Sequence, residues 1–137
     1  MTIDRALVAS ELGLATVDVE EEVVLALEED GTLEQTVVEL DLPLLVAADS
    51  SGATIVAVVA RRPPLVISND AGVTWREAGA GLPPGRDVAI SPEHPDLVLF
   101  AGESRLYLSR DGGRFWHVLA PELPEISAVA WQTEAAR

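Results

Sequence analysis

Two short segments carry side chains that could do chemistry. SNDAGVTW covers residues 68–75, and SRDGGRFW follows 41 residues later at 109–116. Both read Ser-x-Asp-x-Gly-x-x-Trp, so each places a hydroxyl two residues before a carboxylate. The pair could form one duplicated reacting site, or each copy could be a local folding device in a repeated architecture. A calcium loop needs several more carboxylates at alternating positions, which both segments lack, so we expect no metal there.

The spacing of these segments recurs in three independent markers, which shows that the chain is an internal repeat. The markers are Asp30, Asp70 and Asp111; Leu42, Leu82 and Leu123, each followed by proline; and Ser10, Ser50 and Ser91. Successive members of each set lie 40 or 41 residues apart.

The pattern predicts four short strands in each repeat. The apolar runs are rich in β-branched and aromatic residues and are bounded by Pro, Gly, Asp and Ser, which is the pattern of strands and turns. Four strands in about 40 residues are typical of one blade of a β-propeller. A two-helix repeat of similar length is the structural alternative, and the repeated turn residues at hairpin spacing argue against it.

We therefore predict an all-β protein whose propeller-like blades each have four antiparallel strands. The expected organisation is one repeat domain over residues 1–137. Its blades cover about 3–41, 42–81 and 82–122, with an extra strand at 125–132 that is in phase with an innermost strand and begins a fourth blade. In the first blade, residues 5–10 are expected to be the innermost strand and 33–40 the fourth.

The two segments resemble the Asp-box, also called the bacterial neuraminidase repeat. The first matches the pattern fully, and the second has Phe115 in place of the usual threonine. The first repeat keeps Asp30 but has Glu28, Thr32 and Gln35 at the other key positions, so its box is degenerate. Similar repeats occur in sialidases, sortilin-type receptors, xyloglucan-active hydrolases and photosystem II assembly factors, with greatest similarity to the last three groups.

We interpret the box residues as structural. The aspartate can accept hydrogen bonds from turn N–H groups, the glycine permits a positive φ, and the tryptophan can pack between neighbouring sheets. The resemblance implies the same, because boxes of these families lie at the periphery, between the third and fourth strands of a blade. The predicted structural residues are Ser68, Asp70, Gly72, Thr74, Trp75, Ser109, Asp111, Gly113 and Trp116.

A reacting site is harder to find. Sialidases need an arginine cluster, a tyrosine nucleophile and a general acid, and the chain's single tyrosine, Tyr107, stands on a strand where sheet packing explains it. Other glycosidases need a carboxylate pair at fixed separation, and none stands out among the 23 acids. Asp49, Arg86 and Asp87 lie near the entry of innermost strands and are our candidate ligand rim.

Metal and cofactor sites are not indicated. His94 and His117 occupy different phases of the repeat, so we expect solvated histidines and not shared ligands. There is no cysteine, no glycine-rich phosphate loop and no nucleophile elbow in the sequence. We expect neither a metal nor a cofactor.

The composition limits the kinds of molecule that the chain could bind. The formal net charge is −14 and every basic residue is arginine, so a nucleic-acid backbone would be repelled. The longest apolar runs are about eight residues, far short of the roughly 20 that a spanning helix needs. The start lacks the pattern of a secretory signal, and we expect a cytoplasmic protein without membrane or nucleic-acid partners.

Three blades are too few to close a ring, since propellers have roughly four to eight. We expect the chain to associate with itself, as a head-to-tail dimer or by exchange of its C-terminal strand; a piece of a longer propeller is the competing interpretation. The predicted function is a non-catalytic binding or scaffold module for protein–protein interaction. The alternative is a carbohydrate-active or carbohydrate-binding module, similar to part of a sialidase or xyloglucanase.

Overall fold

The computed structural model describes residues 5–33 and 40–132, and within these ranges the chain is all-β. The strands are β1 (Arg5–Ser10), β2 (Gly13–Asp18), β3 (Val23–Glu28), β4 (Leu45–Ser51), β5 (Thr54–Val59), β6 (Leu65–Ser68), β7 (Arg76–Ala78), β8 (Asp87–Ile90), β9 (Val98–Ala101), β10 (Arg105–Ser109), β11 (His117–Glu122) and β12 (Ala128–Trp131). No helix able to cross a membrane occurs in the described residues.

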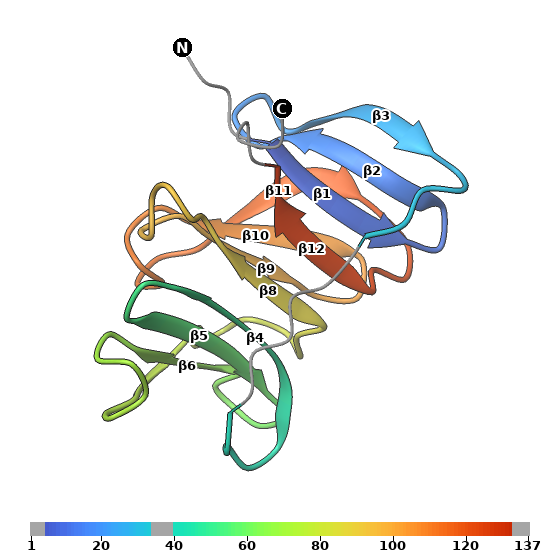
Figure 1. Cartoon of the computed structure of the whole chain (residues 1–137). Coiled ribbons are helices and arrows are strands. Elements are labelled where there is room, and N and C mark those ends of the chain that lie inside the picture. The colour runs from blue at the N-terminus through green and yellow to red at the C-terminus, as the bar shows by residue number, and fades with distance from the viewer. Residues whose placement is uncertain (1–4, 34–39, 133–137) are drawn as a thin grey trace.

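The strands form three four-stranded antiparallel sheets that resemble propeller blades (Figure 1). We call them the outer blade (β4-β5-β6-β7), the middle blade (β8-β9-β10-β11) and the terminal blade (β12-β1-β2-β3). The innermost strands β4 and β12 both contact β8, so the middle blade lies between the other two. The blades therefore follow one another along an arc, and the order in space differs from the order in sequence.

The terminal blade corrects our assignment of the first repeat. β12 pairs antiparallel with β1, with Val8 opposite Val129, so β12 is the innermost strand of this blade and β1 is the second. The segment 125–132 therefore does not begin a fourth blade, and residues 5–10 are not an innermost strand. The expected fourth strand at 33–40 falls largely on residues outside the described ranges.

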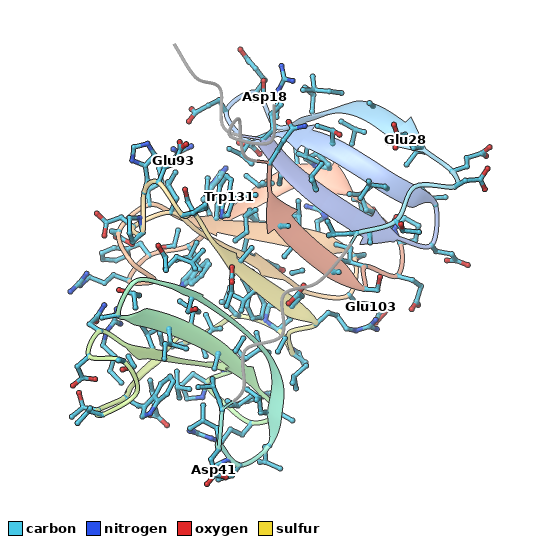
Figure 2. All side chains as sticks on the ribbon, in the orientation of Figure 1. Asp18, Glu28, Asp41, Glu93, Glu103 and Trp131 are labelled. Atoms are coloured by element: carbon cyan, nitrogen blue, oxygen red, sulfur yellow. The ribbon has the colours of Figure 1, made fainter. Side chains whose placement is uncertain are left out.

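The physical reason for this pairing is burial of β12 side chains against the middle blade. Val129 and Trp131 lie on the side of the sheet that faces the middle blade, and both are buried. The indole Nε1 of Trp131 donates to the carbonyl of Ala89 in β8 at 3.1 Å. Figure 2 shows Trp131 where the two blades meet, while Glu28, Asp41 and Glu93 project outward.

Two cores join the three blades, and the middle blade is covered on both faces. Toward the terminal blade it presents Leu99, Leu106 and Leu108, which pack with Val8 and Val17. Toward the outer blade it presents another set, packed against that sheet: Val88, Val98, Phe100, Tyr107 and Trp116 on the middle blade, with Val56, Val58, Leu65 and Ile67 opposite. Alternation along each strand sends successive side chains to these two cores.

Candidate functional site

The two Ser-x-Asp-x-Gly-x-x-Trp segments form the hairpins β6–β7 and β10–β11, and we call them box hairpins 68–75 and 109–116. In the first, Oδ1 of Asp70 accepts the backbone N–H of Thr74 at 2.8 Å, and Oδ2 accepts the Thr74 hydroxyl at 2.6 Å. The Ser68 hydroxyl donates to Asp70 at 2.8 Å and accepts the Gly72 N–H at 2.8 Å. The hydrogen bonds to Thr74 lead the causes that lower the Asp70 pKa to about 2.

Box hairpin 109–116 has the same arrangement without the threonine. Oδ1 of Asp111 accepts the N–H groups of Arg114 and Phe115 at 3.1 and 2.9 Å. The Ser109 hydroxyl donates to Asp111 and accepts the Gly113 N–H. The hydrogen bond from Phe115 is the largest cause of a lowered Asp111 pKa. These hydrogen bonds hold the carboxylates ionised within the turns, a role that stabilises the hairpins.

The glycines and tryptophans of the two hairpins lie in matching positions. Gly72 and Gly113 both have φ of +92°, a region that side chains with a Cβ rarely adopt. Trp116 packs into the core between middle and outer blades, edge-on to Phe100, and its indole donates to the Gly113 carbonyl. Trp75 packs on the opposite face of the outer blade, which no other blade covers.

The counterpart of these hairpins in the terminal blade is the turn after β2, which our repeat alignment missed. Asp30 follows β3 and therefore lies outside any hairpin between third and fourth strands. Asp18 instead ends β2, and its Oδ1 accepts the N–H groups of Glu20 and Glu21 at 2.9 and 3.1 Å. This turn has neither the glycine nor the tryptophan of the box, so the sequence marked it just by its run of acidic residues.

The candidate rim residues lie where neighbouring blades meet. Oδ2 of Asp49 accepts the N–H of Ile90, and Oδ2 of Asp87 accepts the N–H of Val129, both at 2.9 Å. Each aspartate thus connects its own innermost strand to the next. Burial raises the pKa of Asp49, against the opposing effect of its backbone hydrogen bonds. Arg86 is exposed and lies 3.9 and 3.8 Å from Glu103 and Glu125. A ligand role for the three remains a prediction.

The fold does not place the two histidines near each other. His117 lies on β11, where its Nε2 is 2.8 Å from Oε2 of Glu22, whereas His94 lies in the β8–β9 connection with its backbone N–H on the Ser91 hydroxyl. Among the described residues, no group of three His, Asp or Glu side chains is placed to hold a metal.

A groove of 720 Å³ opens between the outer and middle blades. It is bounded by the β5–β6 and β7–β8 connections, at the strand ends opposite to the box hairpins. We call it the proline groove; its lining residues are Arg62, Pro63, Pro64, Ala80, Gly81, Leu82, Pro83, Pro84 and Tyr107. An adjoining cavity of 310 Å³ shares Arg62, Pro64, Leu82 and Pro84 with it.

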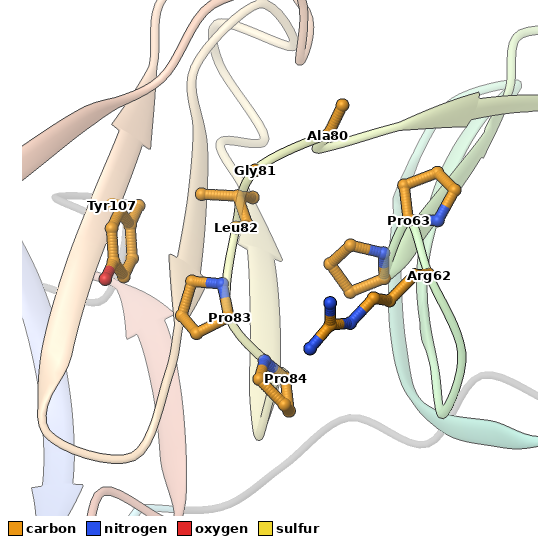
Figure 3. A pocket seen from close by; sticks show the side chains of 9 residues that line it. Arg62, Pro63, Ala80, Gly81, Leu82, Pro83, Pro84 and Tyr107 are labelled. Atoms are coloured by element: carbon orange, nitrogen blue, oxygen red, sulfur yellow. The ribbon is translucent and has the colours of Figure 1, made fainter.

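The walls of the proline groove are held by the blade interface beneath them. Tyr107 lies at one side and Arg62 at the other, with Pro83 and Pro84 between them (Figure 3). The Tyr107 ring meets Phe100 edge-to-face at 5.9 Å between centroids. A Cβ on Gly85 would lie 2.6 Å from the Phe100 ring, so only glycine lets the β7–β8 connection approach this closely.

Comparison with known proteins gives a likeness of fold. No protein-family model and no curated protein matches the chain. Among solved structures, it is similar to the GH74 enzyme of Niastella koreensis, with 17% sequence identity and a TM-score of 0.45. The match covers 85% of this chain and 18% of that enzyme, so the chain spans less than a fifth of its length.

Proposed function

We propose that the chain is a non-catalytic Asp-box module that binds an extended, acidic segment of a partner protein in the proline groove. The observation that carries the proposal is the combination, in one groove, of rigid apolar walls with the Arg62 guanidinium, for which the described part of the chain supplies no ion-pair partner. Neighbouring Arg61 pairs with Glu77 at 2.9 Å, whereas Arg62 has no ion pair among the described residues.

The shape and chemistry of the groove favour an extended peptide. Proline rings have fixed φ and Tyr107 is held against Phe100, so little side-chain entropy is lost when the walls become covered. Extended and polyproline II segments bind in grooves of this type because their backbone is already ordered. A carboxylate on such a segment could form a charge-assisted hydrogen bond with the Arg62 guanidinium.

The catalytic interpretation lacks an assembled site in the described residues. Both box aspartates accept hydrogen bonds within their own turns, and Asp49 bonds the backbone of the neighbouring blade. Tyr107 stands in the proline groove without a carboxylate among the described lining residues. These observations favour binding over catalysis and leave the carbohydrate-binding alternative to the experiment.

The test compares an array of short proline-rich peptides containing glutamate with the same peptides containing glutamine, beside a glycan array. We expect glutamate-dependent binding that is lost in Arg62→Glu and Tyr107→Ala. Arg110→Gln, which alters an exposed arginine outside the groove, should bind like wild type. Binding to glycans alone, binding indifferent to both groove variants, or no binding on either array would overturn the proposal.

A further inference from the structure

Each end of the arc has a sheet face that no other described blade covers. At one end, the terminal blade turns a face away from the middle blade; a row across its four strands is formed by Ala130, Leu7, Thr16 and Ala26. Leu7, Thr16 and Ala130 are half-buried, although the alternate residues of the same strands are buried against the middle blade. We call this face the terminal end face.

At the other end, the outer blade turns the face that carries Trp75 away from the middle blade. Ala57, Val59 and Val66 form its centre, with Leu45, Ala48 and Trp75 packed around them. Leu40 and Leu42, from the connection that precedes β4, also pack on this face. Ala57, Val59 and Val66 are at most 4% exposed, so the open apolar surface of this face is limited to the partly buried residues around them, which include Trp75. We call this face the outer end face.

The internal interfaces show which kinds of face pack together. The middle blade packs on the outer blade with the face that carries its box tryptophan, Trp116. The outer end face is the same side of a blade, since it carries the box tryptophan Trp75. The terminal end face lies on the other side of its blade, as does the outer blade's Val58, Leu65 and Ile67 surface on which Trp116 packs. The two end faces are therefore different sides of a blade, and they correspond to the two sides that pack together at the interfaces within the chain.

We propose that a second copy of this chain closes the arc, with the terminal end face of each copy packed on the outer end face of the other. This closure repeats an interface that the chain already makes twice, and it forms two identical contacts related by a two-fold axis. It joins three blades from each copy into a six-bladed ring, within the usual range for propellers. The proposal is independent of the proline groove, which lies between two blades of one copy.

Solution mass tests the proposal directly. Over a roughly hundredfold range of concentration, we expect light scattering to show a limiting mass of twice the 14.5 kDa of one chain. Because each copy carries a net charge of −14, added salt should strengthen association by screening repulsion. A mass of one chain throughout would overturn the proposal, and so would a mass that rises steadily beyond two chains.

Variants on each end test the direction of packing. Thr16→Arg places a charge in the row of residues that crosses the terminal end face, and Ala48→Arg places one beside the buried centre of the outer end face. Each variant alone should be monomeric with an unchanged circular dichroism spectrum, and a mixture of the two should form a heterodimer through its one intact contact. Phe115→Arg, at a 78% exposed position on the middle blade, is the matched control and should remain dimeric. Dimerisation of either end variant alone, or no heterodimer, would contradict head-to-tail packing.

Discussion

Asp70 and Thr74 are joined by two hydrogen bonds, one from the backbone N–H at 2.8 Å and one from the hydroxyl at 2.6 Å. The ionised carboxylate therefore closes the hairpin between β6 and β7 by accepting at both oxygens. Protonation would remove an acceptor from a turn whose N–H groups have been arranged around it. The stability that this hairpin contributes should therefore depend on pH.

We expect Asp70 to make the folded state more stable above about pH 4 than at pH 2. Its pKa falls from the ordinary 3.8 to about 2 on folding, so the unfolded chain binds the proton more readily. The stabilisation is present above 3.8 and is lost as the pH falls toward about 2. Thermal unfolding of Asp70→Asn should give a lower Tm at pH 5 and a smaller loss of Tm on acidification than wild type.

Asp30→Asn is the control for that experiment, because Asp30 lies in an exposed turn after β3. It should retain the acid sensitivity of wild type. An Asp70→Asn protein that loses as much Tm between pH 5 and 2 as wild type would show that the carboxylate does not act as described.

The two box tryptophans should differ in their contribution to the stability of one chain. Trp116 lies between two blades against Phe100, whereas Trp75 lies on the outer end face. Because Trp116 is partly and not fully buried, we expect Trp116→Ala to cost about 3 kcal/mol of unfolding free energy, near the lower bound for such substitutions. Trp75 is also partly buried but packs within one blade, so Trp75→Ala should cost less than Trp116→Ala when both are measured by urea unfolding in the Thr16→Arg background. Equal costs would show that packing between two blades adds nothing to the contribution of Trp116.

The hairpins could be predicted from sequence because their determinants are local. The Gly72 N–H donates to the Ser68 hydroxyl and the Thr74 N–H donates to Asp70, each four residues earlier, so the residues that form the turn are all in the motif itself. The strand content of the second and third repeats follows from alternation and turn residues for the same reason.

The composition of the terminal blade could not be predicted in this way. β1 and β12 are more than a hundred residues apart in sequence, and β1 can pair along either edge with the same alternation of side chains. The apparent match of Ser10 with Ser50 and Ser91 favoured the wrong position for β1. The burial and hydrogen bonds of Val129 and Trp131 against the middle blade distinguish the two arrangements, and those contacts have no local signature in the sequence.

Variants of Asp49 should separate the effect of its burial on stability from that of its hydrogen bond, at the junction of two blades. Burial raises its pKa, so ionisation costs stability as the pH rises from 3.8 through the raised value. Asp49→Asn can keep an acceptor for the Ile90 N–H without the charge, whereas Asp49→Ala leaves that N–H unpaired. We expect Asn to be close to wild type in Tm at pH 7 and Ala to lose about 1–3 kcal/mol of unfolding free energy. Equal loss in the two variants would show that the hydrogen bond to Ile90 contributes little.

Glu22 should stabilise the outer edge of the contact between the terminal and middle blades. Its Oε1 accepts the Ala120 N–H at 2.8 Å, and its Oε2 lies 2.8 Å from Nε2 of His117. The hydrogen bond with His117 is the largest cause of a lowered Glu22 pKa, so the contact is present above the ordinary 4.5 and is lost as the pH falls below it. At neutral pH, Glu22→Ala should make hydrogen exchange at the Ala120 amide several-fold faster, because the carboxylate is its acceptor. Glu21→Ala removes a neighbouring exposed carboxylate and should leave that amide unchanged. If Ala120 exchanges at the same rate in all three proteins, Glu22 does not hold the two blades together at this edge.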